Sequence, residues 1–306
     1  METIEVEGKQ IRKWKVGAST FLAWPEAGSR LMNWHVQMAD GSIRDVIHWP
    51  ENANYDDIAH VRGGNPVLFP FSARTFCEGE IGFWKAPDGI RRPMQIHGYA
   101  RDGKFELTSS SEKGFLATFI PSDACREAYP YQYKFCVRYR FEELSFIVDF
   151  ELKNEDEQPI PWSAGHHFYF SLPWHEELSR KDYHVNIPAK KAFRQDVDGK
   201  LVPIKDFKQD SGFDDPAISD LIHCKLKHNA VILGPKSGEE ALEILVGEHT
   251  VPSPWTTVVT WTMDDDSPFY CVEPWMGPPN SPEHKQGLHF VDPGKTEVFS
   301  VKVALV

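Results

Sequence analysis

Several features that mark membrane or nucleic-acid-binding proteins are missing from this sequence. No run approaches about 18 uninterrupted apolar residues, the length that a helix needs to span a bilayer. Basic residues are outnumbered: 33 Lys and Arg stand against 45 Asp and Glu, which gives a formal net charge of -12. A surface of this sign repels the phosphates of nucleic acids and of anionic lipids. We therefore expect neither a nucleic acid nor a membrane as a partner.

Paired cysteines are also missing. The five cysteines are odd in number and widely spaced, and no Cys-x-x-Cys pair occurs among them. A disulfide framework or a zinc cluster needs closely matched cysteines, so neither is expected. The first residues are acidic and contain no apolar run, which argues against a secretory signal. Together these absences predict reduced thiols in a cytoplasmic protein.

Sustained helical spacing of apolar residues is absent, and a period of two takes its place. Apolar and polar residues alternate over 131–141 and again over 144–152, with two glutamates between the runs. Two alternating runs joined by a tight turn predict a β-hairpin. Alternating or β-branched runs at 242–246, 256–262 and 299–305 predict further strands.

The strand pattern continues through the chain without an internal repeat, a low-complexity tract or a linker. The 23 prolines and 21 glycines fall between the alternating runs, where turns are expected. Length alone would allow two domains, but β-sandwiches of this size often form one. The sequence therefore predicts an all-β protein, a large antiparallel β-sandwich with residues 1–306 in a single domain.

One segment, 165–170, carries two neighbouring histidines in an aromatic setting. Side chains alternate between the faces of a strand, so His167 and Tyr169 share one face, and His166 and Phe168 share the other. Only one of the two histidines can therefore face a cleft. Taken alone, a histidine in such a strand is more often a hydrogen-bonded structural residue than a catalytic one.

Two more segments combine polar and aromatic residues. By the same alternation, Glu273 and Trp275 share a face of a strand over 271–275. A carboxylate beside an indole suits sugar binding, because the apolar face of a pyranose can stack on the ring. An extended backbone over His97–Arg101 would align its histidine, tyrosine and arginine, although Gly98 weakens that expectation. Taken alone, a carboxylate before a proline is more often solvated, and a tryptophan more often lies in the core.

These segments resemble the motifs of the aldose 1-epimerase (galactose mutarotase-like) family. Gly-His-His-Phe-Tyr-Phe at 165–170 resembles the family's HxYF signature, and Cys-Val-Glu-Pro-Trp at 271–275 resembles its EPW-type catalytic segment. The ending at 287–295 is similar to the family's Gly-Leu…Pro-Gly close. The segments 62–71 and 97–101 resemble RGGxPxxFP and HGFAR of the hexose-phosphate mutarotase branch. The motifs follow the family's order along the chain.

The resemblance implies a mutarotase, an isomerase that interconverts the α and β anomers of a hexose or hexose 6-phosphate. His167 would protonate the ring oxygen, and Glu273 would take the proton of the anomeric hydroxyl. His97 would assist at the ring oxygen or C1. Mutual attraction is expected to keep Glu273 ionised and His167 protonated. One acid and one base suffice, so no cofactor and no metal are expected.

The resemblance also implies substrate-binding residues. Arg74 looks like the sugar-binding arginine, and Asp220 best fits an aspartate that starts a later strand, with Asp214 and Asp215 as rivals. Arg62 and Arg101 lie in the phosphate-sugar segments, and a planar guanidinium bonds phosphate in a bidentate way. The implied substrate-binding set is Arg62, Arg74, Arg101, Asp220 and Trp275.

The sequence departs from the phosphate-sugar branch at several positions. Ile96 stands where that branch usually has glutamine, and Phe168 stands where proline, threonine or serine is commoner. The sugar therefore stays open, as does the choice between a monomer and a homodimer. The only partner expected is a small sugar or sugar phosphate.

Other function classes remain. A non-catalytic carbohydrate-binding sandwich would keep the aromatic residues but would not need both His167 and Glu273. A metal enzyme built on His97, His166, His167 and Glu273 is opposed by the opposite faces of the paired histidines. A glycosidase normally needs two catalytic carboxylates, and only one is placed here.

Overall fold

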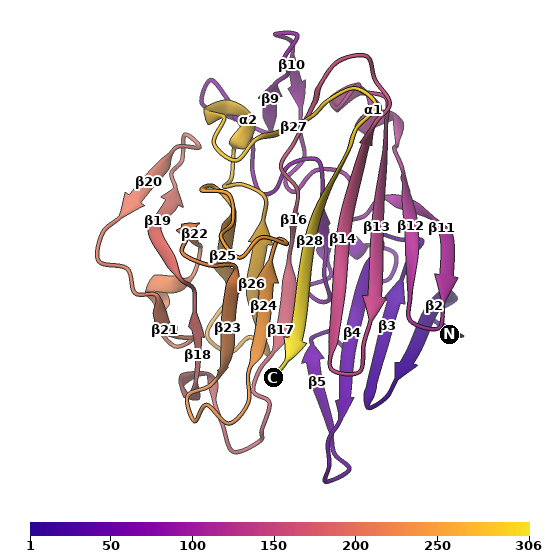
Figure 1. The fold of residues 1–306 in the computed structure, drawn as a ribbon, viewed down its shortest axis with the longest axis vertical. Helices are drawn as coiled ribbons and strands as arrows, with labels where there is room; N and C mark the ends of the chain where they lie inside the picture. The colour runs from indigo at the N-terminus through magenta and orange to yellow at the C-terminus, as the bar shows by residue number, and fades with distance from the viewer.

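The computed structural model describes the whole chain, residues 1–306, as two large β-sheets with short helices at their ends (Figure 1). One sheet has 13 strands and the other has nine, and neighbouring strands pair antiparallel within each. The helices are one to two turns long. The prediction of an all-β antiparallel sandwich is confirmed.

The 13-stranded sheet carries the central segments of both candidate motifs. Its spatial order is β1 (Glu2–Val6), β2 (Lys9–Val16), β3 (Ser19–Trp24), β4 (Arg30–Gln37), β5 (Ile43–Ile47), β17 (Phe168–Ser171), β26 (Phe269–Trp275), β25 (Thr257–Trp261), β22 (Leu221–Leu226), β19 (Ala189–Gln195) and β20 (Leu201–Ile204). Two short strands are added beside β26: β16 (Gly165–His166) and β6 (Val67–Leu68).

The nine-stranded sheet covers one face of the larger sheet. Its order is β11 (Lys104–Ser111), β12 (Gly114–Ile120), β13 (Tyr133–Phe141), β14 (Ser145–Asn154), β28 (Thr296–Leu305), β24 (Leu242–Val246), β23 (Ala230–Pro235), β18 (Tyr183–Asn186) and β21 (Asp210–Gly212). The hairpin predicted from two alternating runs is the pair β13–β14, in which Phe141 lies opposite Phe146.

Smaller elements close the ends of the sandwich. They are the strand pairs β7 (Phe76–Cys77) with β8 (Glu80–Ile81), β9 (Phe83–Lys85) with β10 (Arg91–Pro93), and β15 (Ile160–Trp162) with β27 (His289–Val291), the helices α1 (Asp123–Ala128) and α2 (Ser281–His284), and the 3-10 turns η1 (Ile58–His60), η2 (Arg180–Asp182) and η3 (Pro216–Ile218).

The main core fills the space between the two sheets. It is one cluster of 59 buried hydrophobic residues that extends along the chain from Trp14 to Val303. Aromatic rings interlock in it, as where Phe69 stacks on Phe135 with centroids 3.9 Å apart. Because strand side chains alternate, the other face of the 13-stranded sheet carries a second set of residues. Two small buried clusters lie on that outer face, one around Trp275 and one around Tyr169.

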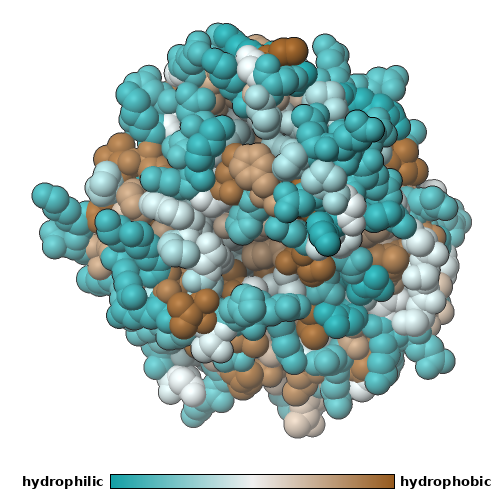
Figure 2. Space-filling model, turned by 45° about the horizontal axis from the view of Figure 1, so that its top comes forward, coloured by the Kyte–Doolittle hydropathy of each residue, from teal (hydrophilic) through white to brown (hydrophobic).

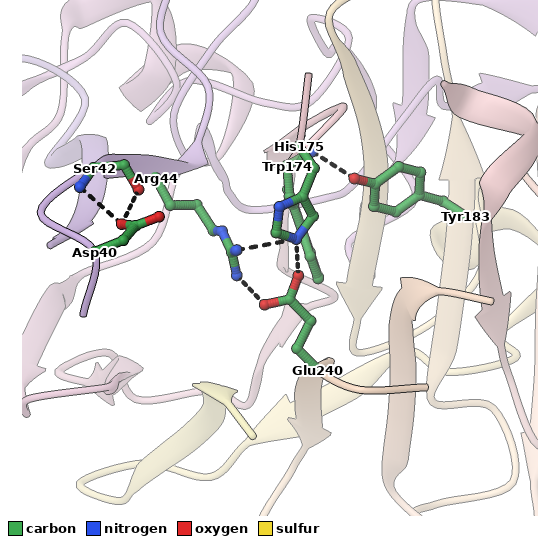
Figure 3. A network of polar contacts seen from close by, with 7 residues as sticks. All are labelled: Asp40, Ser42, Arg44, Trp174, His175, Tyr183 and Glu240. Atoms are coloured by element: carbon green, nitrogen blue, oxygen red, sulfur yellow. Dashed lines mark hydrogen bonds and ion pairs between the residues drawn. The ribbon is translucent and has the colours of Figure 1, made fainter. Parts of the chain in front are cut away.

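A polar network joins the two sheets at the end that lies lowest in Figure 1. Arg44 of β5 pairs with Glu240, which lies in the turn between β23 and β24 (Figure 3). His175 places its Nε2 2.5 Å from the same carboxylate, and the Arg44 guanidinium lies 5.6 Å from the ring of Trp174. The Tyr183 hydroxyl accepts a hydrogen bond from the backbone N–H of Trp174 at 2.6 Å. The network thus connects the large sheet, the small sheet and the chain that follows β17.

The surface is predominantly polar on the face shown in Figure 2, where hydrophobic residues lie singly or in small groups. Large apolar side chains exposed elsewhere, such as Val197 and Val251, are far apart in the sequence. Isolated exposed hydrophobic residues are normal for a folded protein. No helix is long and apolar enough to cross a membrane.

Candidate active site

The two adjacent histidines face opposite sides of the large sheet, as the alternation predicted. His166 is fully buried in the main core, where its ring lies 4.0 Å from that of Phe150 and stacks on Phe168. His167 points to the outer face and stacks on Tyr169 with centroids 4.8 Å apart. Only His167 is therefore in a position to contact a ligand.

Glu273 lies beside His167 on the outer face. It sits in β26, whose neighbour β17 begins directly after His167. The carboxylate oxygen Oε2 of Glu273 lies 3.5 Å from His167 Nε2, and the two side chains are 3% and 11% exposed. Oε2 accepts no hydrogen bond and His167 Nδ1 has no partner, although both atoms are buried. The acid and the base predicted from the sequence thus lie side by side, and each has a buried atom free to bond to a ligand.

Asn65, which sequence reasoning missed, links the two histidines. Its side-chain oxygen accepts the backbone N–H of His167 at 3.1 Å. Its amide nitrogen donates to the Tyr139 hydroxyl at 2.8 Å and lies 3.1 Å from His166 Nδ1. With Nδ1 as the acceptor, the neutral His166 ring carries its proton on Nε2. Asn65 is fully buried and lies inside the 62–71 motif, which was the only signal that could have found it.

Burial controls the protonation of the pair. It lowers the pKa of His167 well below the usual range, and the positive charge of Arg30 adds to the shift. Burial raises the pKa of Glu273 well above its usual range, and the negative charge of Asp220 adds to it. Both shifts oppose the ionised state that mutual attraction of the pair was expected to maintain. Water no longer solvates either charge, so the neutral form of each group is favoured.

His97 reaches the site from a turn, so the expectation of an extended 97–101 segment is wrong. The backbone N–H of Gly98 donates to the Gln95 carbonyl at 2.9 Å, which closes a four-residue turn. His97 and Gly98 both have left-handed backbones, with φ of 66° and 74°. A type II turn requires positive φ at its third residue, here His97. Ile96, at the second position, is exposed at the tip of this turn.

The proton of the His97 ring can be assigned. The backbone N–H of Ala73 donates to His97 Nδ1 at 3.1 Å, so Nδ1 is an acceptor and the neutral ring carries its proton on Nε2. Burial, with the charges of Arg101 and Arg74, lowers the pKa of His97 to about 3. The ring lies 5.5 Å from that of His167. His97 therefore offers a neutral N–H donor beside the pair.

The three predicted arginines share an unusual property: none of their side chains has a hydrogen-bond or ionic partner. Arg62 lies over the ring of Trp261 at 5.7 Å, and Arg101 has a buried Nε without an acceptor. Arg74 is close enough to His97 to lower its pKa. Every other arginine of the chain bonds to a carboxylate or a backbone carbonyl.

Arg30, also missed from the sequence, shows the contrast. It is fully buried and donates to the backbone carbonyls of Ile58, Val61 and Gly63, at 2.6 to 3.2 Å. Those bonds satisfy the guanidinium and hold the loop that presents Arg62. Arg30 therefore has a structural role, whereas the side-chain N–H groups of Arg62, Arg74 and Arg101 have no acceptor within the protein.

The three aspartates considered for binding sugar hydroxyls have different surroundings. Asp214 lies 3.9 Å from Lys236, and Asp215 caps η3 by accepting the backbone N–H of Ala217. Asp220 directly precedes β22, and its charge raises the pKa of Glu273. Of the three, Asp220 is the one that acts electrostatically on the His–Glu pair.

The two tryptophans near the pair differ in exposure. Trp275 is almost completely buried, and its indole N–H donates to the His166 carbonyl at 3.0 Å. In this conformation it supports the strands instead of presenting an open ring to a sugar. Trp261, in β25, is partly exposed and packs edge-on against His167 with centroids 5.9 Å apart. The β-branched run that predicted β25 was the only sequence signal for it.

A cysteine completes the immediate surroundings of the pair. Cys271 lies two residues before Glu273 on β26, so it shares the outer face. A ring nitrogen of His167, Cys271 Sγ and a Glu273 oxygen lie within 4.8 Å of one another. The set of metal ligands considered from the sequence included His166. The structure does not bring that set together, because His166 points into the core. Burial raises the pKa of the Cys271 thiol well above its usual range.

The chain is similar to known proteins in both sequence and fold. The sequence model of the aldose 1-epimerase family matches residues 17–296. The plasmid-encoded LacX protein of Lactococcus lactis is 23% identical over 236 residues, which are 72% of this chain and 76% of LacX. A galactose mutarotase-like protein from Clostridium acetobutylicum is similar in structure, with a TM-score of 0.80 at 16% identity, over 100% of this chain and 98% of that one. The Slr1438 protein from Synechocystis sp. PCC 6803 gives a TM-score of 0.78 at 20% identity, over 100% and 99% of the two chains. At these identities the structural likeness shows a shared fold.

Proposed function

The chain belongs to the aldose 1-epimerase family, and from that premise we propose that it interconverts the anomers of an anionic hexose such as a hexose 6-phosphate. The proposal joins two features of the outer face. The first is a buried pair, His167 and Glu273, whose proton-carrying atoms lie 3.5 Å from each other. The second is a group of three arginines without partners around it.

Ring opening needs one proton delivered to the ring oxygen and one removed from the anomeric hydroxyl. In the proposed reaction Glu273 takes the hydroxyl proton, while His167 donates to the ring oxygen. His97, neutral and with its proton on Nε2, donates a hydrogen bond to the same region of the sugar. After rotation about C1–C2, His167 and Glu273 exchange roles and the ring closes on the other face.

The burial of the pair favours this step. The reaction starts from the ionic form of the pair, which the neutral resting pair reaches by moving one proton from Glu273 to His167. Opening the ring leaves both groups neutral. The total number of protons on the pair is one in each state. A poorly solvated site disfavours separated charges, so opening the ring removes a charge separation that is costly there. When the sugar is in its open-chain form, His167 and Glu273 are thus both neutral, which is the state that burial favours.

The charge of the substrate is inferred from the arginines, which is the observation that carries this part of the proposal. The protein has a net charge of -12, which opposes the approach of an anion. Yet Arg62, Arg74 and Arg101 are unpaired, and a buried polar atom without an acceptor, such as Arg101 Nε, is costly unless a ligand supplies one. A phosphate or sulfonate offers acceptors in the planar geometry that guanidinium groups match.

The experiment is to measure anomer exchange by NMR for a hexose and its 6-phosphate. We expect a higher kcat/KM for the phosphate. Replacing Arg101→Ala should remove most of that preference, by about 1.5–3 kcal/mol or roughly tenfold to a hundredfold, because a charged hydrogen bond is lost. The rate on the free hexose should stay nearly the same.

Arg126→Ala is the matched control, because Arg126 is an exposed arginine paired with Asp123 in α1. It should leave the preference intact. Equal efficiency on the two sugars, with no selective loss in Arg62→Ala or Arg101→Ala, would indicate a neutral-sugar mutarotase. No exchange with any sugar by folded protein would favour a non-catalytic carbohydrate-binding protein.

A further inference from the structure

Three potential metal ligands are fixed by the same pair of adjacent strands. Cys271 and Glu273 both come from β26 and share its outer face, and His167 immediately precedes β17. Their ligand atoms lie within 4.8 Å of one another. The backbone of a central sheet positions all three, so no loop has to close to bring them together.

One of these contacts, between His167 and Glu273, has the spacing of zinc ligands. Zinc binds histidine nitrogen and carboxylate oxygen at about 2.0–2.2 Å in tetrahedral geometry, which places two such ligands roughly 3.4 Å apart. His167 Nε2 and Glu273 Oε2 lie 3.5 Å apart. Cys271 Sγ lies within 4.8 Å of a ring nitrogen of His167 and an oxygen of Glu273, and zinc–sulfur bonds are longer, at about 2.3 Å, so Cys271 is the candidate third ligand.

A second observation points to a ligand at the same place. Glu273 Oε2 is buried and accepts no hydrogen bond, on a side chain that is 3% exposed. A buried carboxylate oxygen without a donor is unfavourable until a proton, a donor or a cation occupies it. The free guanidinium groups of Arg62 and Arg101 do not reach it, because no ion pair joins them to Glu273. A divalent cation would supply the missing partner.

We propose that His167, Cys271 and Glu273 form a binding site for a thiophilic divalent cation such as Zn²⁺, and that its occupation inhibits the enzyme. Binding releases two protons to solvent, the thiol proton of Cys271 and the one proton held by the His167–Glu273 pair, and bonds to the metal replace them. It also takes up the His167 lone pair and the Glu273 carboxylate, the two groups that exchange protons with the sugar. The binding does not depend on the proposed function; the inhibition rests on it.

The donor set predicts which cations bind. Sulfur, imidazole nitrogen and one carboxylate suit Zn²⁺ and Co²⁺, whereas Mg²⁺ prefers six oxygen ligands and keeps several waters. Mg²⁺ should therefore neither bind nor inhibit at concentrations at which Zn²⁺ does. The proposed ligands include the two groups that exchange protons with the sugar, so a bound sugar and the cation should compete.

The binding is tested with Co²⁺ alone as the probe. We expect a sulfur-to-cobalt charge-transfer absorption in the wild-type protein, displaced by Zn²⁺. Cys271→Ser should abolish the band and weaken Zn²⁺ binding by at least about tenfold, the smallest loss seen when only a supporting residue of a metal site is removed. Cys224→Ser is the matched control, since Cys224 is an equally buried cysteine of the same sheet, next to Thr257, and it should keep the band.

The inhibition is tested by measuring anomer exchange with increasing free Zn²⁺, each variant being compared with its own metal-free rate. Wild type and Cys224→Ser should lose activity and regain it with a chelator, and Cys271→Ser should need at least tenfold more Zn²⁺. If Cys271→Ser does not fold, Cys271→Ala replaces it, and the wild-type Co²⁺ spectrum still decides whether the site binds.

Three results would overturn the inference. The first is the absence of a cobalt–thiolate band in the wild type, or its persistence in Cys271→Ser. The second is Zn²⁺ binding with an unchanged exchange rate, and the third is a rate that rises with Zn²⁺. A protein that binds Co²⁺ through Cys271 but exchanges no sugar would leave the metal site standing and contradict only the proposed function.

Discussion

His167 and Glu273 sit on a strand face where water is largely excluded, and this position determines what their side chains can do. Their ionisable groups lie 3.5 Å apart, while burial shifts their pKa values in opposite directions. A pair of groups whose environments drive their pKa values away from solution behaviour is typical of acid–base sites. The neighbouring His166 has no such role, because it faces the core.

Replacing either member of the pair should stop proton transfer without unfolding the protein. We expect Glu273→Gln and His167→Asn each to lower the rate at saturating sugar by about 10²–10⁴-fold, because each removes one proton-transfer partner. His166→Asn should mainly reduce stability, since the smaller side chain leaves a cavity between Phe150 and Phe168. NMR exchange rates and thermal denaturation of the three variants check this. A folded His166→Asn protein without activity, beside an active His167→Asn protein, would reverse the assignment.

The rate should show a bell-shaped dependence on pH, because His167 and Glu273 must together hold one proton. On the acidic side, activity falls when neutral His167 gains a proton; its pKa is lowered, so this limb lies well below pH 6.5. On the alkaline side, activity falls when Glu273 loses its proton; its pKa is raised, so this limb lies well above pH 4.5. Both limbs belong to the coupled pair.

The measurement is kcat/KM against pH, together with infrared spectra of the resting protein. A carboxylic acid band near neutral pH that disappears in Glu273→Gln would show the protonated glutamic acid. If the resting pair is instead ionic, that band is absent. The acidic limb of the pH profile then comes from protonation of Glu273.

Among the elements of the fold, the turn over 95–98 decides where His97 lies. Two backbone bonds hold it: Gly98 N–H to the Gln95 carbonyl and His97 N–H to the Ala73 carbonyl, both 2.9 Å. Gly98 packs so closely that an added Cβ would lie 1.9 Å from the carbonyl oxygen of Phe69. Glycine is required here by contact as well as by its left-handed backbone.

Gly98→Ala should therefore damage both stability and activity. We expect a loss of more than about 1 kcal/mol in the free energy of unfolding, because the left-handed backbone is strained and Phe69 has to move. The displaced turn should also lower kcat by moving His97. Gly238→Ala is the control: Gly238 has a similar φ of 75° but no atom within 4 Å of an added Cβ. A Gly98→Ala protein no less stable than Gly238→Ala would contradict the packing explanation.

At the scale of the whole molecule, the network of Arg44, His175 and Glu240 ties the two sheets together (Figure 3). The side chains of Arg44 and Glu240 are only 4% and 19% exposed. Removing one member of a buried ion pair leaves the other charge without compensation, which is strongly destabilising. The network is thus expected to stabilise the sandwich and not to take part in the reaction.

Glu240→Gln tests this separation of roles. We expect it to lower the free energy of unfolding by about 3 kcal/mol, with little change in the exchange rate of the folded protein. Glu155→Gln serves for comparison, because Glu155 forms an exposed ion pair with Lys153 that is worth about 1 kcal/mol or less. Urea denaturation of both variants gives the comparison. Equal effects of the two substitutions would show that the buried network does not hold the sheets together.

The sequence by itself determined the strands and the faces of their residues. Alternation is a local property of the extended backbone, so the β13–β14 hairpin and the opposite directions of His166 and His167 followed from it. The motifs also identified the family, whose model matches residues 17–296. Motif order along the chain is likewise visible without coordinates.

Only the tertiary structure decided the chemistry around those residues. Burial depends on what the rest of the chain places nearby, and it shifts the pKa values of His167 and Glu273 in the directions that oppose the expected ion pair. The left-handed turn at His97 depends on contacts with segments distant in sequence. The partnerless arginines and the closeness of Cys271 to the pair are also products of packing. Such properties arise between segments, and a pattern within one segment carries no information about them.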